Sequence, residues 1–141
     1  MKVFLSNTVL VDFVTEEGET NGYTLIKQTK GNKTMKAENI NRSKFDQLLK
    51  NDIPVLVDYW APWCGYCRRI GPAYDKIAEQ YQGLVEVVKV NIDDEGALAA
   101  AEQIEVIPTL VFYKGGKAVD SIVAPESKAM IDQFIQEAMQ K

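Results

Sequence analysis

Two cysteines separated by two residues are the side chains of this sequence best suited to chemistry. They are Cys64 and Cys67, with Gly65 and Tyr66 between them. The first thiolate of such a pair attacks a substrate disulfide, and the second cysteine, one helical turn later, resolves the mixed disulfide. Because the pair follows a predicted buried strand and opens a predicted helix, free amide groups and the helix dipole stabilise a thiolate there. We therefore predict that Cys64 is the exposed nucleophile and that Cys67 is the more buried resolving thiol.

The rest of the composition argues against other roles for these cysteines. The 141 residues include no histidine, so the chain has no Cys-His nucleophile. A zinc site would lack two of its usual four ligands unless a second chain supplied them, and we expect no metal site. A disulfide across two residues closes a very small loop and stabilises a fold little. We therefore interpret the pair as redox-active.

Charge and hydropathy narrow the range of partners. The net charge of -4 disfavours a general nucleic-acid binder. No apolar run approaches the about 20 residues of a membrane-spanning helix. The first residues lack the cleavage pattern of a signal peptide, so we expect a cytoplasmic protein without a membrane partner. A processed exported protein would look the same, which leaves a periplasmic or exported location open.

The elements that position the cysteines alternate along residues 35–141. Strands are predicted at residues 55–60, 84–90, 109–113 and 118–123, the last two joined by a turn at Gly115-Gly116. Helices are predicted from Asn41 or Ser43 to Pro54, over residues 64–82 with Pro72 inside, over residues 95–103, and around residues 130–138. The order predicts an α/β fold, a mixed sheet with helices on both faces, in which Trp60 belongs to the core.

Residues 1–34 have a different sequence pattern from residues 35–141, and we interpret them as a separate N-terminal extension. Residues 9–14 and 23–27 have the pattern of two short strands, which predicts a β-hairpin, and residues 30–34 read as a linker. An isolated hairpin is marginal in water. The extension must therefore pack on the domain of residues 35–141, pair with its edge, or stay mobile.

Several segments around and beyond the cysteines resemble the thioredoxin family. They are residues 57–67 (VDYWAPWCGYC), Pro72, residues 89–93 (KVNID) and residues 107–109 (IPT). The resemblance begins near Met35 and covers about three-quarters of the chain. It implies the thioredoxin fold, a central mixed β-sheet flanked by helices, with the cysteines at the start of a kinked helix. It also implies that no cofactor is bound and that the Cys64–Cys67 disulfide is the redox centre.

The resemblance assigns proton transfer to two further residues. Asp58 resembles the family's buried acid, which helps to move the proton when Cys67 attacks. A carboxyl group inside an apolar strand is desolvated, which raises its pKa toward neutrality. Lys89 resembles the lysine partner of that acid. The alternatives are a carboxylate that reaches solvent at a strand edge and an ordinary solvated lysine.

The remaining site residues resemble the family's substrate-binding surface. Trp63 resembles the exposed tryptophan beside the nucleophile, and Pro108 the cis-proline that faces the disulfide. The full predicted set is Trp63, Gly65, Tyr66, Ile107, Pro108 and Val123. Near Val123-Ala124 the family usually has a glycine, so a side chain there narrows the peptide groove, unless an insertion or register shift precedes the last helix.

The resemblance implies a protein-disulfide reductase that acts as a monomer in electron transport and cell redox homeostasis. Its partners would be protein disulfides and, as electron donor, a flavoprotein thioredoxin reductase or a similar protein. Two alternatives stay open. The Gly65-Tyr66 dipeptide replaces the usual Gly-Pro and resembles that of a bacterial periplasmic disulfide isomerase, which favours a more oxidising protein outside the cytoplasm, whereas Ile107 resembles the reducing thioredoxins. The other alternative is a binding module that acts through residues 1–34, although such a module has no need of both cysteines.

Overall fold

The computed structural model describes residues 14–16, 20–22 and 36–141. The chain divides into two units, Met1–Thr34 and Met35–Lys141, which are described separately. In the first unit β1 (Val14–Glu16) pairs antiparallel with β2 (Thr20–Gly22). The predicted strands at residues 9–14 and 23–27 lie outside the described residues apart from Val14, as does the linker. The N-terminal β-hairpin therefore stays a prediction.

The second unit contains a mixed sheet, as the sequence predicts, with the four predicted strands and one more. In spatial order its strands are β3 (Glu38–Asn39), β5 (Glu86–Asn91), β4 (Val55–Trp60), β6 (Thr109–Lys114) and β7 (Lys117–Val123). The first three strands are parallel, and β6 and β7 each run antiparallel to the strand before them in this order. β3 was not predicted, because a strand of two exposed residues carries no hydrophobic pattern.

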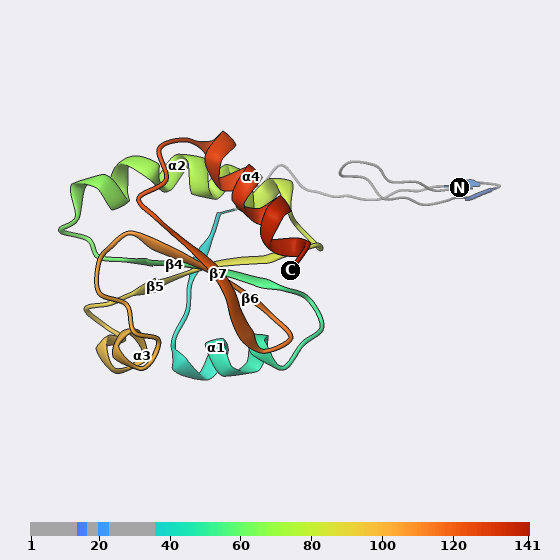
Figure 1. Ribbon diagram of the computed structural model, residues 1–141. Coiled ribbons are helices and arrows are strands. Elements are labelled where there is room, and N and C mark those ends of the chain that lie inside the picture. The colour runs from blue at the N-terminus through green and yellow to red at the C-terminus, as the bar shows by residue number, and fades with distance from the viewer. Residues whose placement is uncertain (1–13, 17–19, 23–35) are drawn as a thin grey trace. The chain divides into compact units, whose positions relative to one another are not determined.

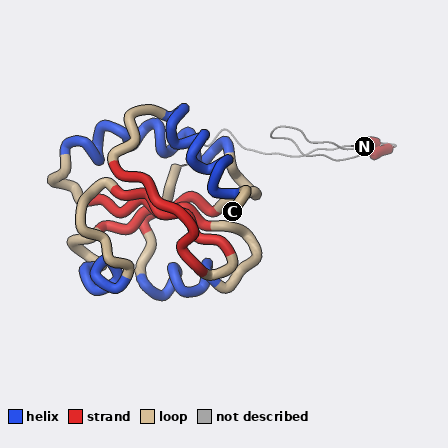
Figure 2. Tube along the Cα trace, in the orientation of Figure 1, coloured by secondary structure: helices blue, strands red, loops and turns tan. Residues whose placement is uncertain are grey.

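Four helices cover the two faces of this sheet. They are α1 (Arg42–Leu49), α2 (Gly65–Gln80), α3 (Gly96–Ala101) and α4 (Lys128–Met139). α2 and α4 lie over one face, and α1 and α3 over the other (Figure 1). The strands form the middle layer between the two helical layers (Figure 2). The layered α/β architecture expected from the resemblance is therefore confirmed.

Strand β4 is buried on both faces, which accounts for its almost continuous apolar sequence. Leu56 packs with α2 and α4, whereas Val55, Val57 and Tyr59 pack with α1 and α3. Side chains alternate along a strand, so Asp58 belongs to the face that α2 and α4 cover. The only acidic residue of β4 is thus enclosed beneath the helix that follows it.

Two hydrophobic residues lie outside the layers in which the sequence places them. Leu84 was predicted to begin the second buried strand, but it is 60% exposed and β5 begins two residues later. It follows Gly83, whose positive φ of 84° belongs to a turn. Met130 has the apolar spacing of the last predicted helix, but in α4 its side chain is 40% exposed. Both cases show a hydrophobic pattern extending past the buried part of an element.

Strand β7 forms one edge of the described sheet. Its residues are exposed or half-buried, and the β6–β7 register shifts between Phe112 and Tyr113. Asp120 of β7 forms an ion pair of 3.1 Å with Lys141. Along residues 14–16, 20–22 and 36–141, no helix is both long enough and apolar enough to cross a membrane.

Candidate active site

The pairing of three strands gathers the predicted site at one end of the sheet. β4 ends at Trp60, and Tyr59 pairs with Thr109 at the start of β6. Thr109 also pairs with Val123 at the end of β7. The loop from β4 to α2, the residues before β6 and the end of β7 therefore meet at the same edge. The sheet brings together segments that are as much as about 60 residues apart in sequence.

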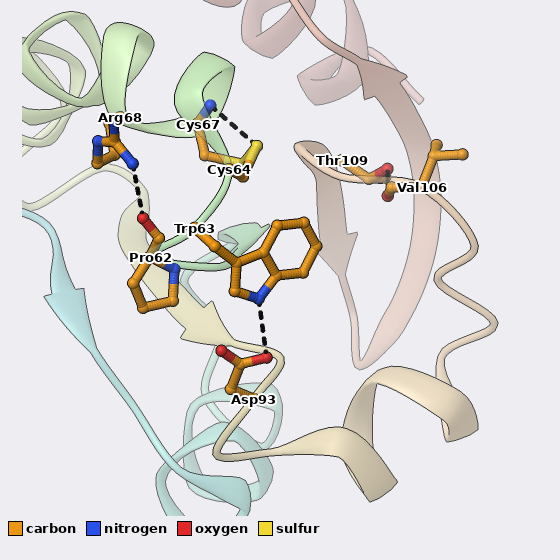
Figure 3. The surroundings of a disulfide bond; sticks show 8 residues. All are labelled: Pro62, Trp63, Cys64, Cys67, Arg68, Asp93, Val106 and Thr109. Carbon is orange, nitrogen blue, oxygen red and sulfur yellow. Dashed lines mark hydrogen bonds between the residues drawn. A yellow bond between two sulfur atoms is a disulfide. The ribbon is translucent and has the colours of Figure 1, made fainter.

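Cys64 and Cys67 form a disulfide at the start of α2, with their Cα atoms 5.3 Å apart. Cys64 is the N-cap residue of α2, and its Sγ accepts a hydrogen bond of 3.2 Å from the backbone N–H of Cys67 (Figure 3). Cys64 is half-buried, whereas Cys67 is only 3% exposed. An amide donor at a helix N-terminus stabilises a thiolate, so the more accessible sulfur lies where a thiolate is favoured.

The residues flanking the disulfide are held by two hydrogen bonds. Trp63 is 66% exposed, and its indole N–H donates to Asp93 Oδ1 over 3.2 Å (Figure 3). Arg68 Nη1 donates to the carbonyl oxygen of Pro62 over 2.8 Å. The first bond fixes a large aromatic surface beside Cys64, where a polypeptide substrate would meet it.

Asp58 is a buried carboxyl group that lacks a full set of partners. It is 2% exposed, and its Oδ1 accepts no hydrogen bond from the described residues. Burial raises the pKa of Asp58 from its ordinary value of 3.8 to about 7, and the positive charge of Lys89 opposes that rise. A carboxyl group with such a pKa gains and loses a proton near neutrality. It is not the solvated strand-edge carboxylate that was the alternative interpretation.

Lys89 is the residue opposite Asp58 in the parallel register of β4 and β5. Its ammonium lies 4.4 Å from the centroid of the Trp60 ring. The indole N–H of Trp60 donates to Asn39 Oδ1 over 2.8 Å. Trp60 is half-buried rather than in the core, because at the end of its strand its indole spans from β3 to Lys89. The prediction that Trp60 is a core residue was therefore wrong.

The segment before β6 has the backbone form that the resemblance implies. The Ile107–Pro108 peptide bond is cis. Pro108 is buried, Ile107 packs at the margin of the α1 and α3 core, and Val106 is 52% exposed. Thr109 Oγ1 donates to the carbonyl oxygen of Val106 over 2.6 Å. Val106 and Thr109 lie among the surroundings of the disulfide (Figure 3).

Val123 and Ala124 occupy the end of β7 and the turn after it. Val123 is 53% exposed, and Ala124 has a φ of 49°, in the left-handed region that favours glycine. The N–H of Ala124 donates to the carbonyl oxygen of Pro108 over 2.9 Å. The glycine-like conformation thus falls on Ala124, one residue after the predicted site residue Val123.

The sequence analysis places Tyr66 in the predicted substrate-binding set but does not predict the contacts of its hydroxyl. Its hydroxyl donates to the carbonyl oxygens of Ala124 and Pro125, over 3.2 Å and 3.0 Å. The ring is half-buried against the core beneath α2 and α4. No local signal reveals these contacts, because the partners are 58 and 59 residues away along the chain. Gly65 beside it is exposed, with open space where a Cβ would stand.

Metal-binding clusters are absent from the part of the chain that the structure describes. No group of three or more Cys, Asp or Glu side chains there could hold an ion. Two sulfur atoms and one buried carboxyl group lie at this end of the sheet. Together they can exchange a disulfide and move the accompanying proton.

Comparison with known proteins agrees with the family resemblance of the sequence motifs. Residues 36–137 match the family model described as Thioredoxin. Thioredoxin 1 of Nostoc sp. is 46% identical over 101 residues, which cover 71% of this chain and 94% of the relative. Thioredoxin of Porphyra purpurea is 41% identical, covering 72% and 95%, and the chloroplastic Thioredoxin M-type of Pisum sativum is 39% identical, covering 69% and 57%.

Proposed function

The chain belongs to the thioredoxin family of protein-disulfide oxidoreductases, and from that membership we propose how its residues reduce disulfide bonds in protein substrates. One observation carries the proposal. Cys64 lies at the N-terminus of α2, where its sulfur accepts the amide hydrogen bond of Cys67. Beneath α2 lies a carboxyl group with a pKa of about 7. This arrangement supplies a nucleophile, a resolving thiol and a proton acceptor.

In the first step the Cys64 thiolate attacks one sulfur of the substrate disulfide. A bond forms between Cys64 Sγ and that sulfur, the substrate S–S bond breaks, and the other substrate sulfur leaves as a thiolate. The positive end of α2 and the N–H of Cys67 stabilise the attacking thiolate. The half-buried position of Cys64 leaves its sulfur open to a polypeptide.

In the second step Cys67 resolves the mixed disulfide. Its thiol gives a proton to Asp58, directly or through one water molecule, and the resulting thiolate attacks Cys64 Sγ. The Cys64–Cys67 disulfide forms, and the second substrate sulfur leaves as a thiolate, so two electrons have passed to the substrate. Because Cys67 is buried, its thiol needs such an internal base. The pKa of Asp58 suits that task near neutrality.

Lys89 adjusts the base rather than acting on sulfur. Its positive charge lowers the pKa of Asp58 and keeps it from rising further through burial. The Lys89 ammonium makes a cation–π contact with the Trp60 ring, and the Trp60 indole N–H donates a hydrogen bond to Asn39. We assign Lys89 and Trp60 as positioning residues for this carboxyl group.

The substrate polypeptide lies across the end of the sheet in this proposal. The exposed apolar side chains of Trp63 and Val106 lie around the disulfide (Figure 3). The exposed Val123 pairs with Thr109 at the same end of the sheet. The backbone at Ile107-Pro108 offers peptide groups to an extended substrate. Gly65 leaves open space beside Cys64.

The finer biological setting belongs to the same proposal. Residues 35–141 form the catalytic domain and residues 1–34 an extension. The relatives include thioredoxins of cyanobacteria and of chloroplasts. We assign this chain to a reducing compartment such as the cytoplasm, as a monomer. A flavoprotein thioredoxin reductase or a similar donor returns two electrons to the Cys64–Cys67 disulfide, in the service of electron transport and cell redox homeostasis.

The reduction potential of the Cys64–Cys67 couple tests the proposal. Equilibration with glutathione redox buffers should place it near the established thioredoxin value of about −270 mV. A value near about −180 to −120 mV, as in disulfide isomerases and strong oxidants, contradicts a reductase. Failure of the dithiothreitol-reduced chain to reduce insulin contradicts the proposal altogether.

A further inference from the structure

The hydroxyl of Tyr66 joins the first turn of α2 to the turn that precedes α4. Its single proton is shared between the carbonyl oxygens of Ala124 and Pro125. Tyr66 is the second residue of α2, between the two cysteines. The bond therefore connects the redox centre directly to a segment that is distant in sequence.

Ala124 adopts a backbone conformation that its own side chain disfavours. With a φ of 49°, its Cβ crowds the neighbouring carbonyl, and only glycine takes this form freely. Both of its backbone polar groups are held: the N–H donates to Pro108, and the carbonyl accepts from Tyr66. Pro125, next in the chain, is buried and its carbonyl accepts from the same hydroxyl. Contacts with distant residues thus hold the turn in an otherwise unfavourable form.

Three segments that border the disulfide are linked through this turn. Ala124 follows Val123, which pairs with Thr109, and its N–H reaches the residue before Thr109. Tyr66 closes the connection from the side of α2. Because the turn is bonded to both Pro108 and Tyr66, we expect its position to set the width of the space beside Cys64. A polypeptide chain needs that space, whereas a small disulfide does not.

We infer that the Tyr66 hydroxyl is a latch that holds the Ala124-Pro125 turn and thereby fixes the groove for polypeptide substrates. The ring itself is secured independently, by the core beneath α2 and α4 and by the Arg69 guanidinium, 4.7 Å from its centroid. Removing the hydroxyl alone therefore releases the turn without displacing the ring. Tyr66 is a specificity-determining residue, and this assignment rests on the proposed function.

The variant Tyr66→Phe tests the latch, with Tyr81→Phe as its matched control. Tyr81 caps the other end of α2, and its hydroxyl donates to Asp132 of α4. Each reduced protein is mixed with insulin and, separately, with the small aromatic disulfide dithiobis(nitrobenzoic acid). The quantity compared is the second-order rate constant for insulin divided by that for the small disulfide. We expect this ratio to fall about threefold to tenfold in Tyr66→Phe, the effect of losing one neutral hydrogen bond. We expect no change of the ratio in Tyr81→Phe.

Amide hydrogen exchange provides a second readout that does not depend on activity. Loss of the latch should lower the protection of the Ala124 amide in Tyr66→Phe and leave it unchanged in Tyr81→Phe. In the background Ala124→Gly, glycine takes the positive φ freely, so Tyr66→Phe should lose most of its effect on the ratio. Equal losses on both substrates, unchanged protection, or the same effect in the glycine background would overturn the latch. Failure of the wild-type chain on insulin, with the protection change still present, would instead count against the proposed function.

Discussion

Asp58 and Lys89 are paired across β4 and β5, yet the lysine ammonium lies under the Trp60 ring, 4.4 Å from its centroid. The positive charge of Lys89 therefore acts on the buried carboxyl group of Asp58 through space. Asp58 Oδ1 accepts no hydrogen bond from the described residues. Desolvation prevails over the attraction, so the pKa rises to about 7. The chain keeps an acid that is half protonated near neutrality at a position where burial is otherwise complete.

Asp58→Asn should stabilise the protein at high pH. From pH 3.8 to about 7 the folded chain binds one more proton at Asp58 than the unfolded chain, so stability falls as pH rises through this window. The penalty is complete above pH about 7 and amounts to at most about 4 kcal/mol. Urea unfolding at pH 8 should show the gain, and at pH 4 the two proteins should be nearly equal. Asp46→Asn, in an exposed pair with Arg42, is the control. A gain of the same size at both pH values contradicts the burial argument.

Lys89→Gln should raise the pKa of Asp58, because the lysine charge lowers it. The carboxyl group then gains its proton at higher pH, and the pH profile of the resolving step moves to the alkaline side. Carbon-13 NMR of the labelled Asp58 carboxyl in the oxidised protein measures the pKa directly. Lys76→Gln removes an exposed charge from α2 and serves as the control. A fall of the Asp58 pKa in Lys89→Gln would refute the through-space role of Lys89.

Serine substitutions should separate the two sulfur atoms. Cys64→Ser should abolish insulin reduction, because the first substrate bond no longer forms. Cys67→Ser should still attack but fail to resolve, so it should accumulate mixed disulfides that are visible as thiol-sensitive adducts by mass spectrometry. Full turnover by Cys64→Ser, or adducts formed on Cys67 instead, would reverse the assignment of nucleophile and resolving thiol.

A chain that begins at residue 35 should fold and work alone. The two described cores on either side of the sheet are built from residues 37–138. We expect the Tm to change by less than about 4 °C, the shift that about 1 kcal/mol produces in a domain of this size. Insulin turnover should be unchanged. Loss of either property would show that residues 1–34 contribute to the domain.

Local pattern was sufficient to predict most of the fold. The apolar run at residues 55–60 and the paired glycines at 115–116 each specify one structure, so the strands and the turn they predict are present. The two-residue strand β3 could not be predicted, because its formation depends on pairing with β5 rather than on its own residues. Likewise, Leu84 has the same type as buried leucines, and only the turn at Gly83 exposes it.

The candidate site, like the fold, has some features that the sequence predicts and others that it does not. The spacing of Cys64 and Cys67 and an acid within an apolar strand are visible in the sequence, and their burial follows from the strand and helix they belong to. The contacts of Tyr66 and the positive φ of Ala124 arise from the meeting of segments nearly 60 residues apart. Periodicity carries no information about such long-range contacts.

Strand β7 carries features that disfavour pairing with the sheet edge of another molecule. A free sheet edge pairs readily with the edge of another molecule, and this is a common first step of aggregation. β7 meets that hazard with an irregular register beside it, an exposed Lys117, and the ion pair between Asp120 and Lys141. Each of these features disturbs the flat, uncharged ladder that an incoming strand requires. We therefore expect this protein to exchange sulfur bonds with disulfide-bearing polypeptides without adding their strands to its own sheet.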